Sequence, residues 1–499
     1  MDYKEIREYV HSLDSTPYIM EPLLGNWSIW SIIKKSIYFL ILNEFHPQQI
    51  SKTKSNKALT KKLRLLRNAV IGAGQYLNYL KRFNKPHLYV HTHSSSRSEK
   101  TVEGCYLDIF LDELLNSRKL ELPPIVIEEE ANWPHLSPPC GPRHCYDDIF
   151  SFAVRIWRRK LIKTIERENS VDEIVGILNS LSLPINRNLI KNVLINTLSN
   201  FEAERLIYKM FVVNSETKAL VIVNAIARQG ILAAAKESNI PVIELQHGII
   251  GGKHYTFDWG FNAKPYKSSM PIPDKILVYG DLWQDLLTEE GFWEKDEIIP
   301  VGSARYDRFN NKVKKQESKN KKTIDLLFTT QYISRNEAIL FLSEYLKIED
   351  TDNQLLTIKV HPIEREYVSE YQELENLYPE NCKVIFDEED TYTLLLKSDI
   401  HISYQSTVLL ESISLGVPSI SICGKFNPGG FAASFEFKGI DAVIKHIMSI
   451  YELNEIVTNY MHDNNYRNNW LDNVEQHRKT IYTKGFIEKA SRVINSQLI

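Results

Sequence analysis

Short apolar runs that end in polar residues alternate along this chain with longer segments of helical periodicity. In the first half such runs occupy 219–224 and 241–245, and in the second half 323–328 and 355–360. Strands that alternate with helices favour a parallel, doubly wound α/β sheet. A polar, lysine-rich stretch at 310–322 interrupts the pattern before it restarts. We therefore predict two such sheets joined by a linker.

The two ends of the chain show helical periodicity without a strand signal. We predict a helical extension at 1–85, a Rossmann-like domain at 86–309, a second Rossmann-like domain at 323–440 and terminal helices at 441–499. A length of 499 residues fits more than one hydrophobic core. Open parallel sheets bind ligands beyond the carboxyl ends of their strands. Two such sheets facing each other would form a cleft, with a donor on one side and an acceptor on the other.

Composition excludes several classes of protein. A hydrophobic share of 43% and a charged share of 25% are ordinary for a globular protein, and the net charge of −3 provides no basic field for nucleic acid. Cys140 and Cys145 stand near His144, which leaves a zinc site open, but the usual second pair of ligands is missing. We expect reduced thiols in a cytoplasmic protein, with no metal and no cofactor.

The most apolar early segment, Trp27–Leu42, is interrupted by two lysines and is shorter than the ~20 residues of a membrane span. A buried helix is the simpler interpretation. The alternative is a helix on the inner face of the cell membrane, helped by the basic run at 52–67, which would attract anionic lipid. That alternative predicts peripheral membrane contact through residues 27–67. A basic run is more commonly a solvated helix face.

Polar residues follow three apolar runs of the second half. Thr330 follows the first run, and His361-Pro362 follow the second, where proline holds His361 in an extended backbone and aims its side chain off the strand. Ser406-Thr407 open a helix after the third run, at 399–403. Free N–H groups and the helix dipole favour a phosphate there, although plain helix capping would use the same groups.

A carboxylate one helical turn later could accept hydrogen bonds from ribose hydroxyls. These observations predict a nucleotide site made by Thr330, His361, Pro362, Ser406, Thr407 and Glu411. The segment carries neither GxGxxG nor GxxxxGK[ST], so the usual basis for a dinucleotide or P-loop site is missing.

The first half has a different set of candidates. His247 ends a buried strand and is the best candidate for a general base, because imidazole can take a proton near neutral pH. Gly248 would let a ligand approach the backbone closely. A histidine with a purely structural role at a strand end is the alternative. Weaker candidates for the base are Glu130 and Asp258, and the predicted acceptor side also includes Ser95, Arg97 and Gln246.

Taken together, four motifs resemble those of bacterial GT-B glycosyltransferases that build surface polysaccharides. They are QHG at 246–248, GSARYD at 302–307, HP at 361–362 and S-T-x-x-x-E at 406–411. The most similar families are CMP-sialic acid and CMP-Kdo transferases and CDP-glycerol glycerophosphotransferases. The resemblance covers about residues 215–425. It implies that HP and the Ser-Thr pair bind a cytidine nucleotide and that His247 is the base.

The resemblance implies transfer of a CMP-activated acidic sugar, such as a sialic acid-like or Kdo residue, to a capsule or lipopolysaccharide acceptor. The partners would be a nucleotide sugar and a glycan or lipid-linked glycan, without a metal. Two departures weaken the finer assignment: the acidic D/E-D/E-G motif is not evident, and Gln246 replaces the tryptophan of the teichoic-acid motif. A UDP-sugar transferase, a nucleotide-sugar epimerase, a CDP-glycerol transferase and a non-catalytic assembly scaffold stay open.

Overall fold

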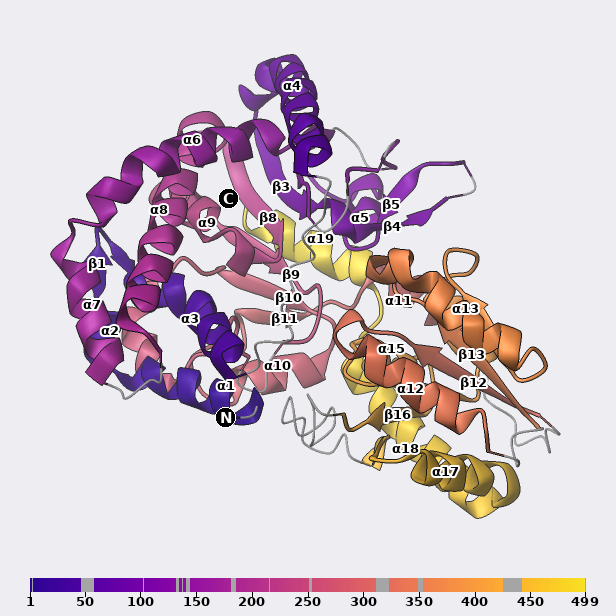
Figure 1. Ribbon diagram of the computed structural model, residues 1–499. Helices are drawn as coiled ribbons and strands as arrows, with labels where there is room; N and C mark the ends of the chain where they lie inside the picture. Colours follow the sequence, from indigo (N-terminus) through magenta and orange to yellow (C-terminus); the bar gives the residue numbers. More distant parts are fainter. Residues whose placement is uncertain are drawn as a thin grey trace.

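The computed structural model contains two α/β domains with helices at both ends of the chain (Figure 1). It describes residues 1–499 except 2, 46–57, 102, 132–133, 137, 141–143, 181–184, 215, 251–253, 311–322, 349–352, 425–441 and 499. The predicted linker at 310–322 falls outside the described residues apart from Asn310, which ends a helix.

The first domain is built on a seven-stranded parallel sheet in the order β11-β10-β9-β8-β3-β6-β7. The strands are β3 (His87–His93), β6 (Pro124–Glu129), β7 (His144–Tyr146), β8 (Thr217–Val223), β9 (Val242–Leu245), β10 (Lys275–Val278) and β11 (Ile298–Pro300). The central strands are buried, which suits their continuous apolar sequences. The strand order reverses between β3 and β8, so this sheet is doubly wound.

The second domain is built on a six-stranded parallel sheet in the order β14-β13-β12-β15-β16-β17. Its strands are β12 (Ile324–Thr329), β13 (Gln354–Lys359), β14 (Cys382–Ile385), β15 (Ile400–Ser403), β16 (Ser419–Ile422) and β17 (Ile444–Ile447). Numbered within the domain, the order is 3-2-1-4-5-6, with its reversal between β12 and β15. The predicted fold class, two Rossmann-like domains with helical additions, is confirmed. The sheet continues to β17, beyond the predicted boundary at 440.

Helices of the first domain and its N-terminal addition cover the first sheet. They are α1 (Tyr3–Ser12), α2 (Pro17–Met20), α3 (Ile29–Phe45), α4 (Ala58–Phe83), α5 (Asp112–Asn116), α6 (Asp148–Ile165), α7 (Asn169–Ser180), α8 (Arg187–Phe211), α9 (Gln229–Glu237), α10 (Asp281–Thr288) and α11 (Ala304–Asn310), with a short β1 (Pro22–Leu24) and β2 (Trp27–Ser28) pair before α3.

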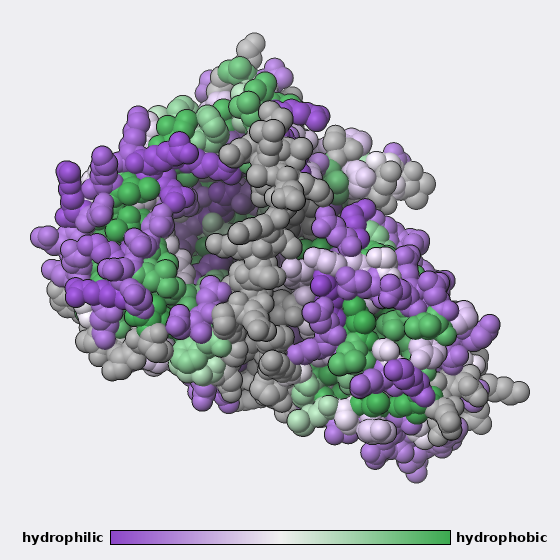
Figure 2. All heavy atoms as spheres, viewed as in Figure 1, coloured by the Kyte–Doolittle hydropathy of each residue, from purple (hydrophilic) through white to green (hydrophobic). Residues whose placement is uncertain are grey.

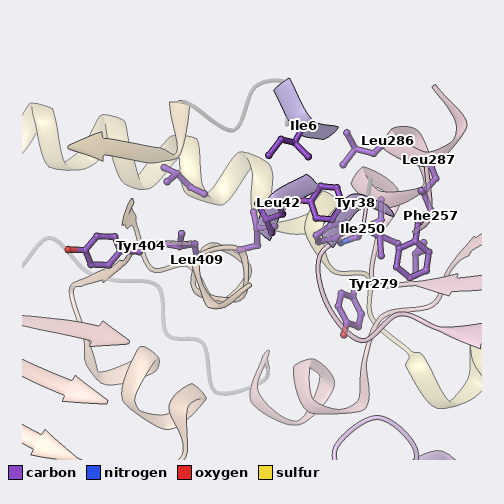
Figure 3. Close-up of a cluster of buried hydrophobic side chains, with 14 of the residues drawn as sticks. Ile6, Tyr38, Leu42, Ile250, Phe257, Tyr279, Leu286, Leu287, Tyr404 and Leu409 are labelled. Atoms are coloured by element: carbon purple, nitrogen blue, oxygen red, sulfur yellow. The ribbon is translucent and has the colours of Figure 1, made fainter. Parts of the chain in front are cut away.

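Helix α3 is the apolar segment for which a membrane surface was one interpretation, and it lies inside the protein. Eleven of its residues are buried, and Lys34 within it bonds Asp14 at 2.7 Å. Figure 3 shows Tyr38 and Leu42 of this helix in the same buried apolar cluster as Leu409 of the second domain. The buried-helix interpretation is therefore correct for α3. No described helix is both long and apolar enough to cross a bilayer.

The helices at the C-terminal end join the two domains. The second domain carries α12 (Arg335–Tyr345), α13 (Val368–Leu377), α14 (Thr391–Lys397), α15 (Val408–Ser414) and α17 (Ile450–His462), after which α18 (Asn464–Ile481) and α19 (Phe486–Ser496) follow. Trp283 of the first domain donates to the carbonyl of Ile481 at 2.9 Å, and Tyr279 stacks on Tyr482. Phe486 and Ile494 of α19 enter the core beside the first sheet, where Figure 1 shows α19.

A glycine is required where this crossing segment touches the first domain. Gly302 has a φ of +89°, and a Cβ there would lie 2.1 Å from the carbonyl oxygen of Thr483. Any other residue would both strain the backbone and push the two segments apart.

A small hairpin, β4 (Arg97–Lys100) with β5 (Tyr106–Asp108), follows β3 and was not predicted. Beside it, Cys105 and Cys140 form a disulfide. The prediction of reduced thiols is therefore wrong for this pair, because folding brings two cysteines 35 residues apart into contact. The zinc interpretation also loses Cys140, and Cys145 is buried beside the carbonyl of Gly72.

Candidate functional site

Three adjacent strand ends of the second sheet carry the predicted donor residues. Strand β12 lies between β13 and β15, so Thr330, His361 and Ser406 follow neighbouring strands. The backbone N–H of His361 donates to Thr330 Oγ1 at 2.9 Å. Gln331 holds the third loop, since its side-chain oxygen accepts from the N–H of Gln405 at 2.7 Å. The strand-end loops converge as expected, at the point where the strand order reverses.

Glu364, which was not predicted as a site residue, holds Thr330 in the position from which it contacts His361. It is fully buried, accepts the hydroxyl of Thr330, and accepts the hydroxyl of Tyr371 at 2.9 Å. Burial raises the pKa of Glu364, and the two hydroxyl bonds offset part of that rise. Its only signal in the sequence is a carboxylate three residues after His361, in the turn that Pro362 begins.

The tautomer of His361 follows from its local hydrogen bond. The N–H of Ile363 donates to His361 Nδ1 at 3.2 Å, so Nδ1 is the acceptor and a neutral ring carries its proton on Nε2. Burial by the surrounding protein lowers the pKa of His361. The ring is therefore neutral near pH 7 and carries its donor, Nε2–H, in a residue that is exposed to solvent.

Ser406 caps helix α15, which was the structural alternative. Its Oγ accepts from the N–H of Val408 at 3.2 Å, and the carbonyl of Thr407 accepts the N–H of Glu411 at 3.1 Å. The cap uses the serine oxygen as an acceptor. Its hydroxyl hydrogen is still available to donate to a ligand.

Glu411 lies at the junction of the two domains. Burial raises its pKa, Arg305 of the first domain offsets that rise, and the Tyr392 hydroxyl donates a hydrogen bond to it. Arg305 also pairs with Asp390 at 2.5 Å and lies 4.1 Å from the ring centre of Tyr392. Helix α11 of the first domain therefore meets the start of α14 of the second domain here, and Glu411 is held by protein groups.

On the first domain, His247 lies beside His93, with ring centres 6.4 Å apart. Burial, followed by the charges of the neighbouring His93 and Lys35, lowers the pKa of His247 to about 3. Its Nδ1 is buried and has no hydrogen-bond partner among the described residues. His93 ends β3, contacts Ser95 Oγ at 2.6 Å through Nδ1, and was not a predicted site residue. Two neutral histidines therefore lie near the reversal point of this sheet.

Gln246 and Gly248 shape the loop that carries His247. The Gln246 amide is buried, with its oxygen accepting the N–H of Tyr279 at 2.8 Å and its nitrogen donating to the carbonyl of Gly248 at 2.8 Å. A Cβ on Gly248 would meet nothing within 4 Å, so open space adjoins this backbone. The buried Gln246 side chain therefore fixes the loop conformation and does not face a ligand.

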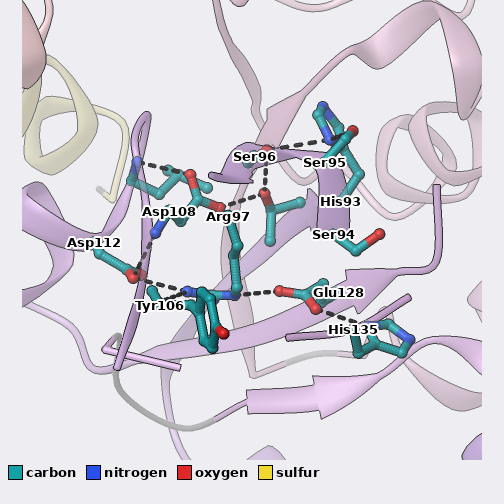
Figure 4. A network of polar contacts seen from close by, with 12 residues as sticks. His93, Ser94, Ser95, Ser96, Arg97, Tyr106, Asp108, Asp112, Glu128 and His135 are labelled. Atoms are coloured by element: carbon teal, nitrogen blue, oxygen red, sulfur yellow. Dashed lines mark hydrogen bonds and ion pairs between the residues drawn. The ribbon is translucent and has the colours of Figure 1, made fainter. Parts of the chain in front are cut away.

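Arg97, a predicted acceptor residue, is buried in an ion-pair network (Figure 4). It bonds Asp112 at 2.8 Å and also bonds Glu128, and the protein satisfies its charge. The network holds the β4–β5 hairpin against β6. Arg97 therefore has a structural role, whereas Ser95, the other candidate on this segment, is half-buried and contacts His93.

Glu130 and Asp258, the weaker candidates for the base, lie elsewhere in the first domain. Glu130 accepts from Arg64 at 2.7 Å and from Asn68 at 3.0 Å. Asp258 is buried, and its backbone carbonyl accepts from Lys34 at 2.9 Å, next to the N-terminal helices. Neither carboxylate lies beside His247 in a described contact.

Glu130, His135 and Asp148 offer ligand atoms within 4.8 Å of one another, as a metal site would. The ring nitrogens of His135 already contact Glu128 at 2.6 Å and Asp148 at 2.8 Å. Burial alone would lower the pKa of His135, but the hydrogen bonds to both carboxylates outweigh it and raise the pKa to about 9. A charged ring and Arg64 balance these carboxylates, and a metal would have to displace both.

A cavity of about 380 Å³ opens at the carboxyl end of β8, and Figure 2 shows a hydrophilic recess in this domain. Its walls come from α3, α6, α8 and the start of α9. They combine amides, hydroxyls and two cations with apolar side chains: Ile32, Lys35, Ser36, Arg158, Asn196, Thr197, Asn200, Phe201, Glu204, Ile226, Ala227, Gln229 and Gly230. Lys35, which lines this cavity, also lowers the pKa of His247 through its charge.

Comparison with known proteins shows similarity in fold only. No family model matches the sequence, and no curated protein matches it. A UDP-N-acetylglucosamine 2-epimerase is 12% identical with a TM-score of 0.45, covering 83% of this chain and 96% of its own. The kitacinnamycin glycotransferase is 12% identical with a TM-score of 0.48, covering 83% and 100%.

The wall teichoic acid polymerase TagF is 11% identical with a TM-score of 0.47, covering 91% of this chain and 98% of its own. At these values the three structures carry no argument about chemistry.

Proposed function

We propose that this protein is a glycosyltransferase that moves a sugar from a nucleotide donor to a glycan or lipid-linked glycan acceptor. The observation that supports it best is the meeting of Thr330, His361 and Ser406 at adjacent strand ends, where the second sheet reverses its order. Doubly wound sheets bind nucleotides at that point. A CMP-activated acidic sugar is the proposed donor, on the strength of the HP and Ser-Thr motifs.

The donor half stabilises the leaving nucleotide by hydrogen bonds. His361 Nε2–H and the Ser406 hydroxyl donate to phosphate oxygens as negative charge develops on them. Thr330 and Glu364 keep the His361 backbone in place, so these donors need little rearrangement during the reaction. Pro362 and Thr407 shape the two loops, and Glu411 is the proposed partner of the ribose if the Tyr392 hydroxyl yields to it.

The acceptor half supplies the base. His247 is neutral, so a ring nitrogen can take the proton of an acceptor hydroxyl. The acceptor oxygen then forms a bond to the anomeric carbon while the bond from that carbon to the phosphate oxygen breaks, and the nucleotide leaves with the electron pair. An anionic substrate beside His247 would raise its pKa and strengthen it as a base. The polar cavity next to Lys35 is the proposed place of the acceptor.

A screen of nucleotide sugars tests this proposal. The protein is incubated separately with CMP-, CDP- and UDP-linked donors and a mixed glycan acceptor, and mass spectrometry follows the free nucleotide and the extended acceptor. Release of CMP coupled to acceptor extension is expected, with His247→Ala losing the transfer and keeping the wild-type thermal unfolding profile.

The same screen separates the alternatives. Turnover of a UDP-sugar without an acceptor would favour an epimerase, and turnover of CDP-glycerol would favour glycerophosphate transfer. If no nucleotide raises the melting temperature and none is consumed, the non-catalytic scaffold is correct and the proposal fails.

A further inference from the structure

Helix α4 exposes an apolar stripe. Leu66, Val70 and Leu77 are 55%, 67% and 65% exposed, and their spacing places them on one face of the helix. The opposite face packs inward, where Gly72 lies against Tyr146 and the ring of Tyr76 meets Phe150 at 5.3 Å. The helix is therefore held to the domain by one side and presents apolar side chains on the other.

Neighbouring elements widen this stripe into a surface. Helix α6 packs against α4 and exposes Phe152 and Ile156. At the end of α8, Met210 and Phe211 are exposed, and the Tyr76 hydroxyl donates to the carbonyl of Phe211 at 2.6 Å. Together the exposed apolar residues form what we call the α4–α6 face: Leu66, Val70, Leu77, Phe152, Ile156, Met210 and Phe211. Figure 2 shows hydrophobic residues gathered over α4.

The two helices of this face are strongly basic. Residues 58–83 contain six Lys and Arg and no Asp or Glu, although the whole chain has a net charge of −3. Residues 148–165 contain five Lys and Arg and one acid, Asp148, which is buried. Exposed cations border the apolar side chains: Arg67, Arg155, Arg159, Lys160 and Lys163.

We propose that the α4–α6 face binds the anionic surface of a lipid bilayer. Apolar side chains would enter the interface between headgroups and acyl chains while the surrounding cations pair with anionic headgroups. A second copy of this chain fits less well, because the cations beside the apolar side chains of the two faces would repel each other. The spread of the apolar residues over three elements also fits a plane better than a single partner helix.

This surface differs from the apolar segment that the sequence suggested, because α3 is buried. It stands independently of the proposed transferase activity. If that activity holds, the same helix α6 that contacts lipid also supplies Arg158 to the acceptor cavity. A lipid-linked acceptor would then approach from the bound membrane.

Vesicle co-sedimentation of the full chain tests the proposal. Vesicles of phosphatidylcholine alone are compared with vesicles containing phosphatidylglycerol, at low and high salt. We expect binding only to the anionic vesicles, weakened by salt. The double substitution Leu66→Ser with Val70→Ser, and separately the triple substitution Arg155→Gln, Arg159→Gln and Lys160→Gln, should each reduce binding at least tenfold.

Leu377→Ser, on α13 of the second domain and equally exposed, is the matched control and should bind like wild type. All substituted residues are exposed, so the folded state should survive, and thermal unfolding checks this. No binding to anionic vesicles, or equal losses in the control, would overturn the proposal. A dimer in lipid-free solution that the Leu66 and Val70 substitutions dissolve would identify a second copy as the partner instead.

Discussion

Replacing Thr330 with valine tests whether the donor loops are held as described. Valine has nearly the same shape as threonine and removes only the hydroxyl, which accepts from the N–H of His361 at 2.9 Å and donates to Glu364. Thr330 is 3% exposed and Glu364 is fully buried, so the protein shields the Thr330 hydroxyl from solvent. Thr330→Val therefore removes two hydrogen bonds without opening a cavity.

The magnitude follows from these two bonds. A buried polar group that loses its partner costs about 1–3 kcal/mol, and Glu364 keeps the Tyr371 bond. We expect Thr330→Val to lower the free energy of unfolding by about 2–3 kcal/mol. His361 should also lose its fixed position, so nucleotide affinity should fall in the same variant.

Urea unfolding followed by fluorescence measures the first effect, and titration calorimetry with CMP measures the second. Thr330→Ser retains the hydroxyl and should restore most of both. Thr480→Val is the control, since its hydroxyl bonds a helix carbonyl at an exposed position and its loss should cost less than about 0.5 kcal/mol. A Thr330→Val protein as stable as the control variant would refute the reasoning.

Three further substitutions test other parts of the structure by denaturant unfolding. Gly302→Ala should cost about 2 kcal/mol more than Gly485→Ala, because both glycines have a positive φ near +90° but only the first would place a Cβ against Thr483; equal costs would contradict the tight crossing. Burial lowers the pKa of His401 to about 3, so the unfolded chain takes up the proton first as the pH falls below about 6.5. Wild type should then lose about 2 kcal/mol relative to His401→Gln between pH 7 and pH 5, whereas a constant difference would show that the ring is not held neutral. Arg97→Met leaves two buried carboxylates without their cation and should lower the free energy of unfolding by about 3–5 kcal/mol. A variant as stable as wild type would contradict the structural role of Arg97 and favour a role in acceptor binding.

The two sheets could be predicted because parallel strands covered on both faces are continuous apolar runs. The runs at 219–224 and 355–360 correspond to β8 and β13. The meeting of Thr330, His361 and Ser406 followed from the same reasoning, since strand ends of one parallel sheet share an edge. These predictions needed only local sequence and one general rule about sheets.

Other features depend on contacts between residues far apart in the chain. No local sequence pattern predicts the Cys105–Cys140 disulfide or the packing of α19 against the first domain. In the sequence, Arg97 looks like any arginine that could bind a ligand. Only the positions of Asp112 and Glu128 in the fold show that its charge is paired within the protein. Local sequence gives the residue type, whereas burial and partners decide the role.

Hydropathy alone also failed to predict which helix exposes apolar side chains that could contact a membrane. Helix α3 is the more apolar segment, yet it is buried because α1 and α8 pack against it. Helix α4 is less apolar overall but leaves Leu66 and Val70 exposed. Mean hydropathy cannot separate these cases, because the fold determines which face is covered.

A CMP titration tests most directly whether the second domain binds a nucleotide through His361. Isothermal calorimetry compares wild type with His361→Ala and with His462→Ala, an exposed histidine of the same domain. We predict that wild type and His462→Ala bind CMP with the same Kd and that His361→Ala binds at least tenfold more weakly, about 1.4 kcal/mol. Equal affinity in all three proteins, or no binding of CMP to wild type, would contradict the account.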